Sequence, residues 1–212
     1  DDRIGVLTAI GAVSPPGGDL SDPVAQATLR IVKVFWGLDS ALAYKRHFPA
    51  INWLNSYSLY TDKIDSWKTQ ELAPEWAELR NDAMRLLQEE AELEEIVRLV
   101  GQDSLSAIDR LKLEAARSLR EDYLLQDSFD EIDTYTSVQK QYRMLSLVMQ
   151  FYYEGSRAVE SDVPFKALSS LAVRDDISRL KLITEDAFED YARQVKQKIT
   201  EQIQSLQARE VQ

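Results

Sequence analysis

The chain has 212 residues, and its 36 acidic side chains outnumber its 25 basic ones, which leaves a formal net charge of −11 at pH 7. This acidic balance disfavours general nucleic-acid binding, which requires an excess of positive charge, and no apolar run approaches the roughly 18 residues of a membrane span. The lack of cysteine excludes disulfides and thiolate metal sites, and a single histidine, His47, excludes a multi-histidine metal centre. We therefore expect no nucleic-acid partner and no direct membrane insertion.

The composition changes about a quarter of the way along the chain. Residues 1–60 hold five of the seven glycines and four of the six prolines, and they carry five acidic and five basic side chains. The whole excess of negative charge therefore belongs to the remainder. We expect two structural regions with a boundary near residues 60–66, and we divide the chain into residues 1–62 and 63–212.

The first region has the pattern of strands and loops. Residues 4–10 are apolar and partly β-branched, and they lead into a loop at Ser14–Asp19. Residues 29–36 also have strand propensity and end at Gly37. Because two isolated strands are at best marginally stable in water, we expect these segments to be the end of a larger sheet. The chain is thus expected to be a fragment, or to need partners.

The second region has helical periodicity. Apolar residues recur every three or four positions over residues 75–100, and Gly101 follows as a helix stop. Ser106 and Asp109 form the Ser-x-x-acid pattern that opens a helix. Further helices are expected over about residues 138–153 and after Thr184. The pattern predicts a helical bundle.

Several single features have structural explanations that outweigh functional ones. The acidic run Glu89–Glu95 is expected to be a solvated helix face, His47 to be structural, and Met144 and Met149 to fill a core. The sequence contains neither the G-x-x-x-x-G-K-[ST] nor the G-x-G-x-x-G phosphate-binding pattern. We therefore expect that it cannot transfer a phosphoryl group unaided.

Aromatic residues beside loops leave two interpretations open. Phe48 precedes Pro49, and Phe129 and Tyr135 flank an acidic loop. Such rings can be platforms on which a nucleotide base stacks, or they can fill the seam between the two regions. The spacing alone favours the second interpretation.

Two strings of the sequence are specific enough to suggest a family. These are SPPGGD at Ser14–Asp19 and HFPAINW at His47–Trp53. With the strings EEIVRLVG (94–101) and KQY (140–142), they resemble the catalytic A subunits of the rotary V-type and A-type ATPases, over nearly the whole chain but weakly after about residue 160. The resemblance implies a mainly α fold: a C-terminal helical bundle preceded by the last β-strands of a P-loop α/β nucleotide-binding domain.

The resemblance also implies a binding site. Phe48 stands where an aromatic side chain stacks on adenine, and Phe129, Tyr135 and Thr136 match the second wall of that pocket. The implied cofactor of the full-length parent is ATP or ADP with magnesium, with none expected to bind tightly to this chain. The phosphate-binding loop, the magnesium-holding residues and the catalytic glutamate are expected upstream of Asp1, so we assign no catalytic residue and no metal ligand and expect the 212-residue chain to be inactive by itself.

Two further segments are implied to face a central-stalk rotor subunit. They comprise Gly17, Gly18 and Asp19 in the first loop, and Asp103, Ser104, Leu105 and Ser106 in the turn between two helices. The implied partners are non-catalytic B subunits in an alternating A/B hexamer, one of which supplies the arginine finger. The implied location is the cytoplasmic face of a membrane, on the soluble head of an ion-translocating ATPase. The alternative is a free-standing helical interaction module without a nucleotide role.

Overall fold

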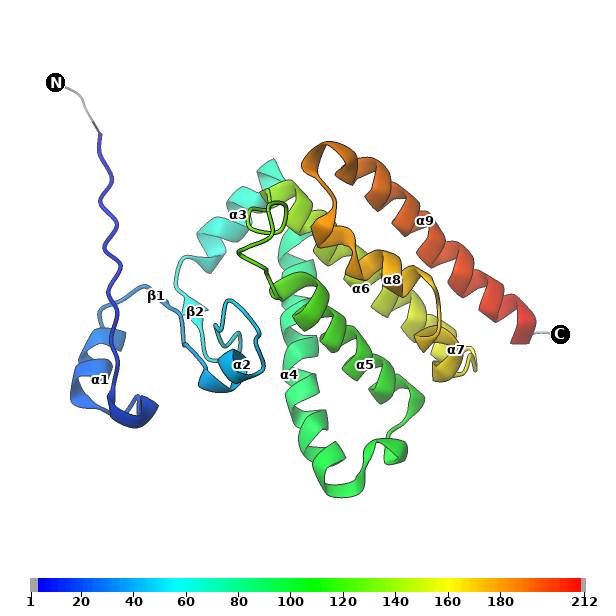
Figure 1. The fold of residues 1–212 in the computed structure, drawn as a ribbon, viewed down its shortest axis with the longest axis horizontal. Coiled ribbons are helices and arrows are strands. Elements are labelled where there is room, and N and C mark those ends of the chain that lie inside the picture. The colour runs from blue at the N-terminus through cyan, green and yellow to red at the C-terminus, as the bar shows by residue number, and fades with distance from the viewer. Residues whose placement is uncertain (1–3, 211–212) are drawn as a thin grey trace.

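The computed structural model describes residues 4–210, and this part of the chain is mainly helical (Figure 1). In chain order, the helices are α1 (Pro23–Leu29), α2 (Ser40–Tyr44), α3 (Thr61–Glu71), α4 (Trp76–Val100), α5 (Ala107–Ser118), α6 (Val138–Glu160), α7 (Phe165–Ser169), α8 (Val173–Ser178) and α9 (Glu185–Glu210). Short 3-10 turns cover Pro16–Gly18, Gln102–Ser104 and Leu180–Leu182, and a π-helical stretch, Leu119–Leu124, continues α5. The two-stranded sheet pairs β1 (Val34–Phe35) antiparallel to β2 (Tyr57–Ser58). The expected mainly α fold is confirmed.

The bundle is built around α6, which packs against α4, α5 and α9. The apolar stripes of these helices meet in one core, and Figure 1 shows α5 and α6 side by side with α9 along the outer side of the bundle. Met144 and Met149 are buried in this core, as their spacing predicted. A packed apolar interior of this kind supplies most of the stability of helices that are marginal on their own.

The ends of the helices follow local chemistry that the sequence displays. Gly101 ends α4 with a φ of 84°, a conformation that favours glycine. Ser106 opens α5, and its Oγ accepts a hydrogen bond from the Asp109 N–H at 3.1 Å. Ser137 caps α6 in the same way through Lys140 N–H at 3.1 Å. The expected helices are present, although α6 continues to Glu160, beyond the expected end at residue 153.

The two expected strands of the first region are wrong as drawn from the sequence. Residues 4–13 have no regular secondary structure, and Ile4 is 97% exposed. Leu29 ends a helix instead of starting a strand, and only Val34 and Phe35 of residues 29–36 join the sheet. Strand propensity acts only when a neighbouring strand satisfies the backbone, and the described chain provides one partner, β2, for one short segment.

No helix of the described residues 4–210 is long and apolar enough to cross a membrane.

The cap of α5 makes a testable contribution to stability. Replacing Ser106 with Ala leaves the Asp109 N–H without its acceptor, so we expect the free energy of unfolding to fall by about 1 kcal/mol. Urea unfolding followed by circular dichroism measures this change. The exposed loop residue Ser128 provides the control, and Ser128→Ala is expected to unfold like the parent chain. Equal midpoints for Ser106→Ala and Ser128→Ala would show that the cap contributes nothing.

Candidate functional site

The two segments that carry the loop aromatics meet in the structure. The N–H of Gln126 donates a hydrogen bond to the carbonyl of Phe48 at 2.8 Å. This bond joins the turn of residues 46–49 to the loop of residues 125–137, which we call the aromatic loop. Phe48 is 51% exposed, Phe129 96% and Tyr135 76%. Rings this exposed do not fill a seam, so the interpretation that the spacing alone favoured is wrong, and the rings are free to meet a ligand.

The seam is filled by a neighbouring pair of residues instead. His47 is 8% exposed, and its ring lies 5.5 Å from that of Trp53, which packs against the bundle core. His47 is therefore buried in the seam, whereas the adjacent Phe48 is half exposed. The structural role expected for His47 is confirmed by this packing.

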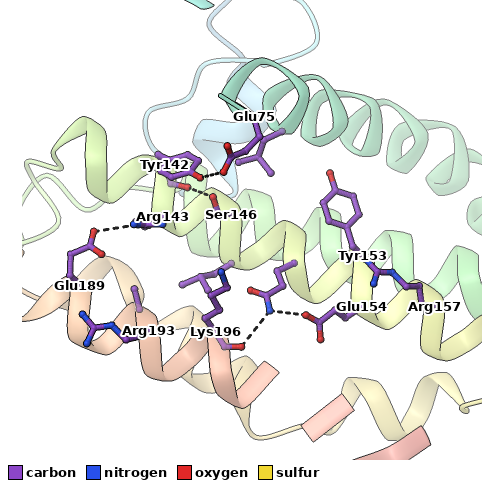
Figure 2. Close-up of a pocket in the computed structure, with 14 residues that line it drawn as sticks. Glu75, Tyr142, Arg143, Ser146, Tyr153, Glu154, Arg157, Glu189, Arg193 and Lys196 are labelled. Atoms are coloured by element: carbon purple, nitrogen blue, oxygen red, sulfur yellow. Dashed lines mark hydrogen bonds and ion pairs between the residues drawn. The ribbon is translucent and has the colours of Figure 1, made fainter. Parts of the chain in front are cut away.

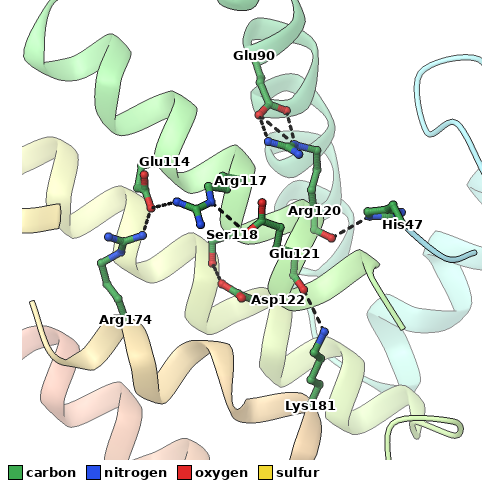
Figure 3. Close-up of polar contacts among 10 residues, drawn as sticks. All are labelled: His47, Glu90, Glu114, Arg117, Ser118, Arg120, Glu121, Asp122, Arg174 and Lys181. Atoms are coloured by element: carbon green, nitrogen blue, oxygen red, sulfur yellow. Dashed lines mark hydrogen bonds and ion pairs between the residues drawn. The ribbon is translucent and has the colours of Figure 1, made fainter. Parts of the chain in front are cut away.

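Arg120 connects the 46–49 turn to the bundle (Figure 3). Its carbonyl accepts one hydrogen bond from His47 Nε2 at 3.0 Å and another from the Leu125 N–H at 2.9 Å. Because a carbonyl oxygen only accepts, His47 Nε2 carries the proton. The guanidinium group of Arg120 forms a forked ion pair with Glu90 of α4, at 2.9 to 3.1 Å. One residue thus holds the turn, the start of the aromatic loop and α4 together.

Glu90 corrects the expectation that residues 89–95 form a solvated face. It is 5% exposed and belongs to the inner side of α4, whereas Glu92, Glu94 and Glu95 are exposed. Burial raises the pKa of the Glu90 carboxyl, and the hydrogen bonds and charge of Arg120 oppose that rise. We call this buried ion pair of Glu90 and Arg120 the joint. Its structural role could not be predicted from a run of acidic residues.

The acidic side chains of the aromatic loop bind the loop's own backbone. Asp133, only 3% exposed, accepts a hydrogen bond from the Asp127 N–H at 2.7 Å, and its carbonyl accepts one from Gln126 Nε2 at 2.7 Å. Asp130 Oδ1 accepts from the N–H groups of Ile132 and Asp133, both at 2.8 Å. These bonds lower the pKa of the Asp130 carboxyl. Hydrogen bonds within the loop therefore stabilise its conformation, and Asp130 and Asp133 have a structural role in it.

Two lysines support the base of this loop from the bundle. Lys140, 1% exposed, donates from Nζ to the carbonyls of Lys181 and Ile183 at 2.9 and 2.6 Å. Lys181 Nζ in turn donates to the carbonyls of Glu121 and Leu125 at 3.0 and 3.2 Å. Burial lowers the pKa of the Lys140 ammonium group, and nearby carboxylates oppose that effect. The carbonyls at the end of the π-helical stretch thus acquire donors where the helix itself supplies none.

The residues expected to face a rotor lie in two exposed turns and include one buried side chain. Gly17 and Gly18 adopt φ values of 65° and 73° in the first turn, and Asp19 is exposed beside them. Figure 1 shows this turn and the tip of the α4–α5 hairpin toward the same edge of the view.

In the hairpin tip, Asp103, Ser104 and Ser106 are exposed, but Leu105 is 8% exposed and points inward. Leu99 is 82% exposed and Val100 59%, at the end of α4. Sequence reasoning missed this apolar end, although apolar residues that continue past the buried stripe of α4 are its signal.

Two cavities lie elsewhere in the bundle. The first, of about 570 Å³, is lined by α4, α6 and α9, and Figure 2 shows some of its polar residues paired, among them Tyr142 with Glu75 and Arg143 with Glu189. Tyr142 donates to Glu75, and Arg143 lies 3.4 Å from Glu189. The second, of about 470 Å³, lies among α5 to α8. Neither is lined by the residues expected to contact adenine, and residues 4–210 contain no group of three or more metal-ligating side chains placed to hold an ion.

Comparison with known families divides the chain in two. Residues 1–58 match the ATP synthase alpha/beta family, nucleotide-binding domain, and residues 65–168 match the C-terminal domain of V and A type ATP synthase.

Individual relatives match the chain along most or all of its length. The V-type ATP synthase alpha chain of Acetivibrio thermocellus is 62% identical over all 212 residues, which are 36% of that protein. The corresponding chain of Clostridium botulinum strain Langeland is 65% identical over 188 residues, 89% of this chain and 32% of the relative. The chain thus spans about a third of the length of these relatives.

A solved structure shows a similar fold. It is described as a unique ATP synthase subunit, NeqB, from Nanoarcheaum equitans, and it is 24% identical with a TM-score of 0.53. It covers 65% of this chain, which matches 32% of that one.

The ion pair of Arg120 should carry a large share of the joint's stability. In Arg120→Met, Glu90 keeps its burial and loses its cation, and we expect the free energy of unfolding to fall by about 3 kcal/mol. Arg98→Met is the matched control, because Arg98 and its partner Glu95 are 72% and 64% exposed and such pairs contribute at most about 1 kcal/mol. Equal losses in the two variants would contradict a buried joint.

The pH dependence of the same variant tests the cause. Without Arg120, the pKa of the Glu90 carboxyl in the folded chain rises further above its unfolded value. A carboxyl of this kind holds more protons in the folded state, so its contribution to stability falls as pH rises through that interval. Chemical unfolding should therefore show a larger loss in Arg120→Met near pH 8 than near pH 5.

Proposed function

Because the chain belongs to the family of V-type ATP synthase alpha chains, we propose that it is the C-terminal part of the A subunit of an ion-translocating rotary ATPase. In this proposal, residues 1–62 end the nucleotide-binding domain and residues 63–212 form the helical domain. The chain contributes a wall of the adenine pocket and a rotor-facing helical hairpin. It couples ATP hydrolysis or synthesis to rotation of the central stalk.

The main support for the proposed adenine pocket is the contact between the 46–49 turn and the aromatic loop. Phe48 and Phe129 are exposed on segments joined by the Gln126–Phe48 backbone bond, and a flat aromatic face is what a purine base stacks on. Tyr135 and Thr136 belong to the same loop, which its own hydrogen bonds hold in place. These four residues would contact the base, and ATP or ADP with magnesium would be the bound cofactor in the complete protein.

The hairpin supports the second half of the proposal. Helix α4 (Trp76–Val100) carries Glu90 in its interior and ends at the exposed Leu99 and Val100. We propose that this end, with the exposed Asp103, Ser104 and Ser106, faces the central-stalk subunit, together with Gly17, Gly18 and Asp19. Leu105 then shapes the tip from inside, because its side chain is buried.

The remaining partners and the location follow from the same family. We propose an alternating hexamer with non-catalytic B subunits in the soluble head on the cytoplasmic face of a membrane. The 212-residue chain is expected to hydrolyse no ATP alone, since its sequence holds no G-x-x-x-x-G-K-[ST] loop. The alternative, a helical interaction module with no nucleotide role, predicts no dependence of nucleotide affinity on Phe48 or Phe129.

Substitution of the pocket rings tests the first half. In the assembled complex, Phe48→Ala or Phe129→Ala should weaken nucleotide binding by roughly 1–3 kcal/mol, about 5- to 150-fold, through lost stacking. Since the ring contacts the base and not the reacting phosphate, KM should rise while kcat changes little. Tyr44→Ala, which removes a ring that is 88% exposed on α2, is the control. Unchanged affinity in both phenylalanine variants would favour the alternative module.

Substitution at the hairpin end tests the second half. Leu99→Ser should leave nucleotide affinity at the parent value and lower the number of ions transported per ATP hydrolysed, because it removes an apolar contact with the rotor and touches no pocket residue. Met84→Ser is the matched control, since Met84 is an exposed apolar residue four turns earlier on α4. Paired measurements of ion transport and ATP hydrolysis in vesicles report the ratio. The rotor contact is refuted if the two variants transport equally.

A further inference from the structure

We propose that Asp133 is a positioning residue that sets the aromatic loop against Phe48 and thereby determines affinity for the nucleotide base. The inference rests on the proposed adenine pocket and adds a residue that contacts no base itself. Asp133 lies inside the loop, and its effect on a ligand passes through Gln126 and Asp127.

Asp133 accepts two separate hydrogen bonds from the residues that begin the loop, Gln126 and Asp127. Its Oδ2 accepts from the Asp127 N–H, and its carbonyl accepts from the Gln126 side chain, each at 2.7 Å. Gln126 is also the residue whose N–H reaches Phe48 O. The two walls of the pocket therefore share one residue, Gln126, and Asp133 fixes that residue from the loop side.

Burial separates Asp133 from the other acids of the loop. It is 3% exposed, whereas Asp127 and Glu131 are exposed. A carboxylate this buried requires hydrogen-bond partners or a nearby cation, and the Asp127 N–H supplies one such bond. Removal of the Asp133 side chain leaves that N–H without its acceptor and frees the segment that carries Phe129.

The link between Asp133 and the ring is short along the chain. Phe129 N–H donates to Asp127 Oδ1 at 2.9 Å, so Asp127 is bonded to Asp133 through its backbone and to Phe129 through its side chain. A 96% exposed ring has few contacts of its own to hold it. These bonds set the backbone position from which the ring projects, and the entropy lost when a base orders the loop is lower when they are intact.

The experiment compares two ligands of the assembled complex that share phosphates but differ in the base. Asp133→Ala should weaken ATP binding by about 5- to 50-fold, within the range for loss of one stacked ring, with kcat nearly unchanged. Binding of inorganic tripolyphosphate, which has no base, should stay within about twofold of the parent, since no phosphate contact is altered. Asp133→Asn keeps an acceptor oxygen for the Asp127 N–H and should restore most of the ATP affinity.

Controls separate this role from general damage and from failure of the pocket itself. Glu131→Ala removes an exposed acid from the same loop and should leave both ligands unaffected. Should Asp133→Ala fail to assemble, Gln126→Met decides, because it deletes only the side-chain donor to the Asp133 carbonyl and should cause a smaller loss that is again selective for ATP. Equal losses for ATP and tripolyphosphate, or no loss for ATP, would overturn the positioning role. If Phe48→Ala and Phe129→Ala also leave ATP binding unchanged, the pocket assignment fails; if they weaken it, only the role of Asp133 fails.

Discussion

The arrangement of the candidate site depends on one residue, Arg120, which bonds through its backbone and its side chain in different directions. Its carbonyl uses both acceptor positions, one for His47 and one for the Leu125 N–H. Its guanidinium group forms an ion pair with the buried Glu90 carboxylate of α4. The Leu125 bond spans five residues and closes the π-helical stretch Leu119–Leu124, so the carbonyl accepts from His47 in addition to its partner within the helix. The 46–49 turn, the aromatic loop and α4 consequently have a common reference point.

Hydrogen bonds inside the aromatic loop engage two of its acids in an acidic chain that also presents aromatic rings. The net charge of −11 would be expected to surround any site with carboxylates that repel a nucleotide. In the aromatic loop, however, Asp130 and Asp133 accept hydrogen bonds from backbone N–H groups. Bonds of this kind stabilise the carboxylates and hold the loop in one conformation. Phe129 and Tyr135 are exposed in this loop, and the exposed acids beside them are Asp127 and Glu131.

Local patterns in the sequence were sufficient for the four long helices of the bundle, α4, α5, α6 and α9, but did not predict α1, α2, α3, α7 or α8. Helix ends depend on short-range chemistry, and Gly101 and Ser106 display it within four residues of the element that each one bounds. Strand formation depends on a neighbour that local patterns do not reveal, which is why residues 4–10 and 29–36 were misassigned.

Contacts between residues far apart in the sequence could not be predicted from the spacing of residue types. Glu90 and Arg120 are 30 residues apart, and His47 and Arg120 are 73 apart, so no periodicity in the sequence reports either pair. The exposed aromatics were identified as candidates by their place beside loops, but spacing favoured burial, and only the resemblance pointed to a base. Leu105 is buried and Leu99 is exposed at the same end of the hairpin, a difference that the apolar character of both residues does not reveal.

The distance between joint and tip bears on how the two proposed halves can act together. Glu90 and Val100 are ten residues apart on one continuous helix, or about 15 Å at the helical rise per residue. A helix of this length without proline or a π-bulge is stiff, so a shift of the 46–49 turn that moves Arg120 and Glu90 displaces the tip as well. Exposed leucine and valine at that tip have no partner within the described chain, and contiguous apolar surface at the end of a stiff element is where a partner surface is expected. The coupling then needs no flexible relay: it requires one buried ion pair at the joint and a rigid helix between the pair and the contact.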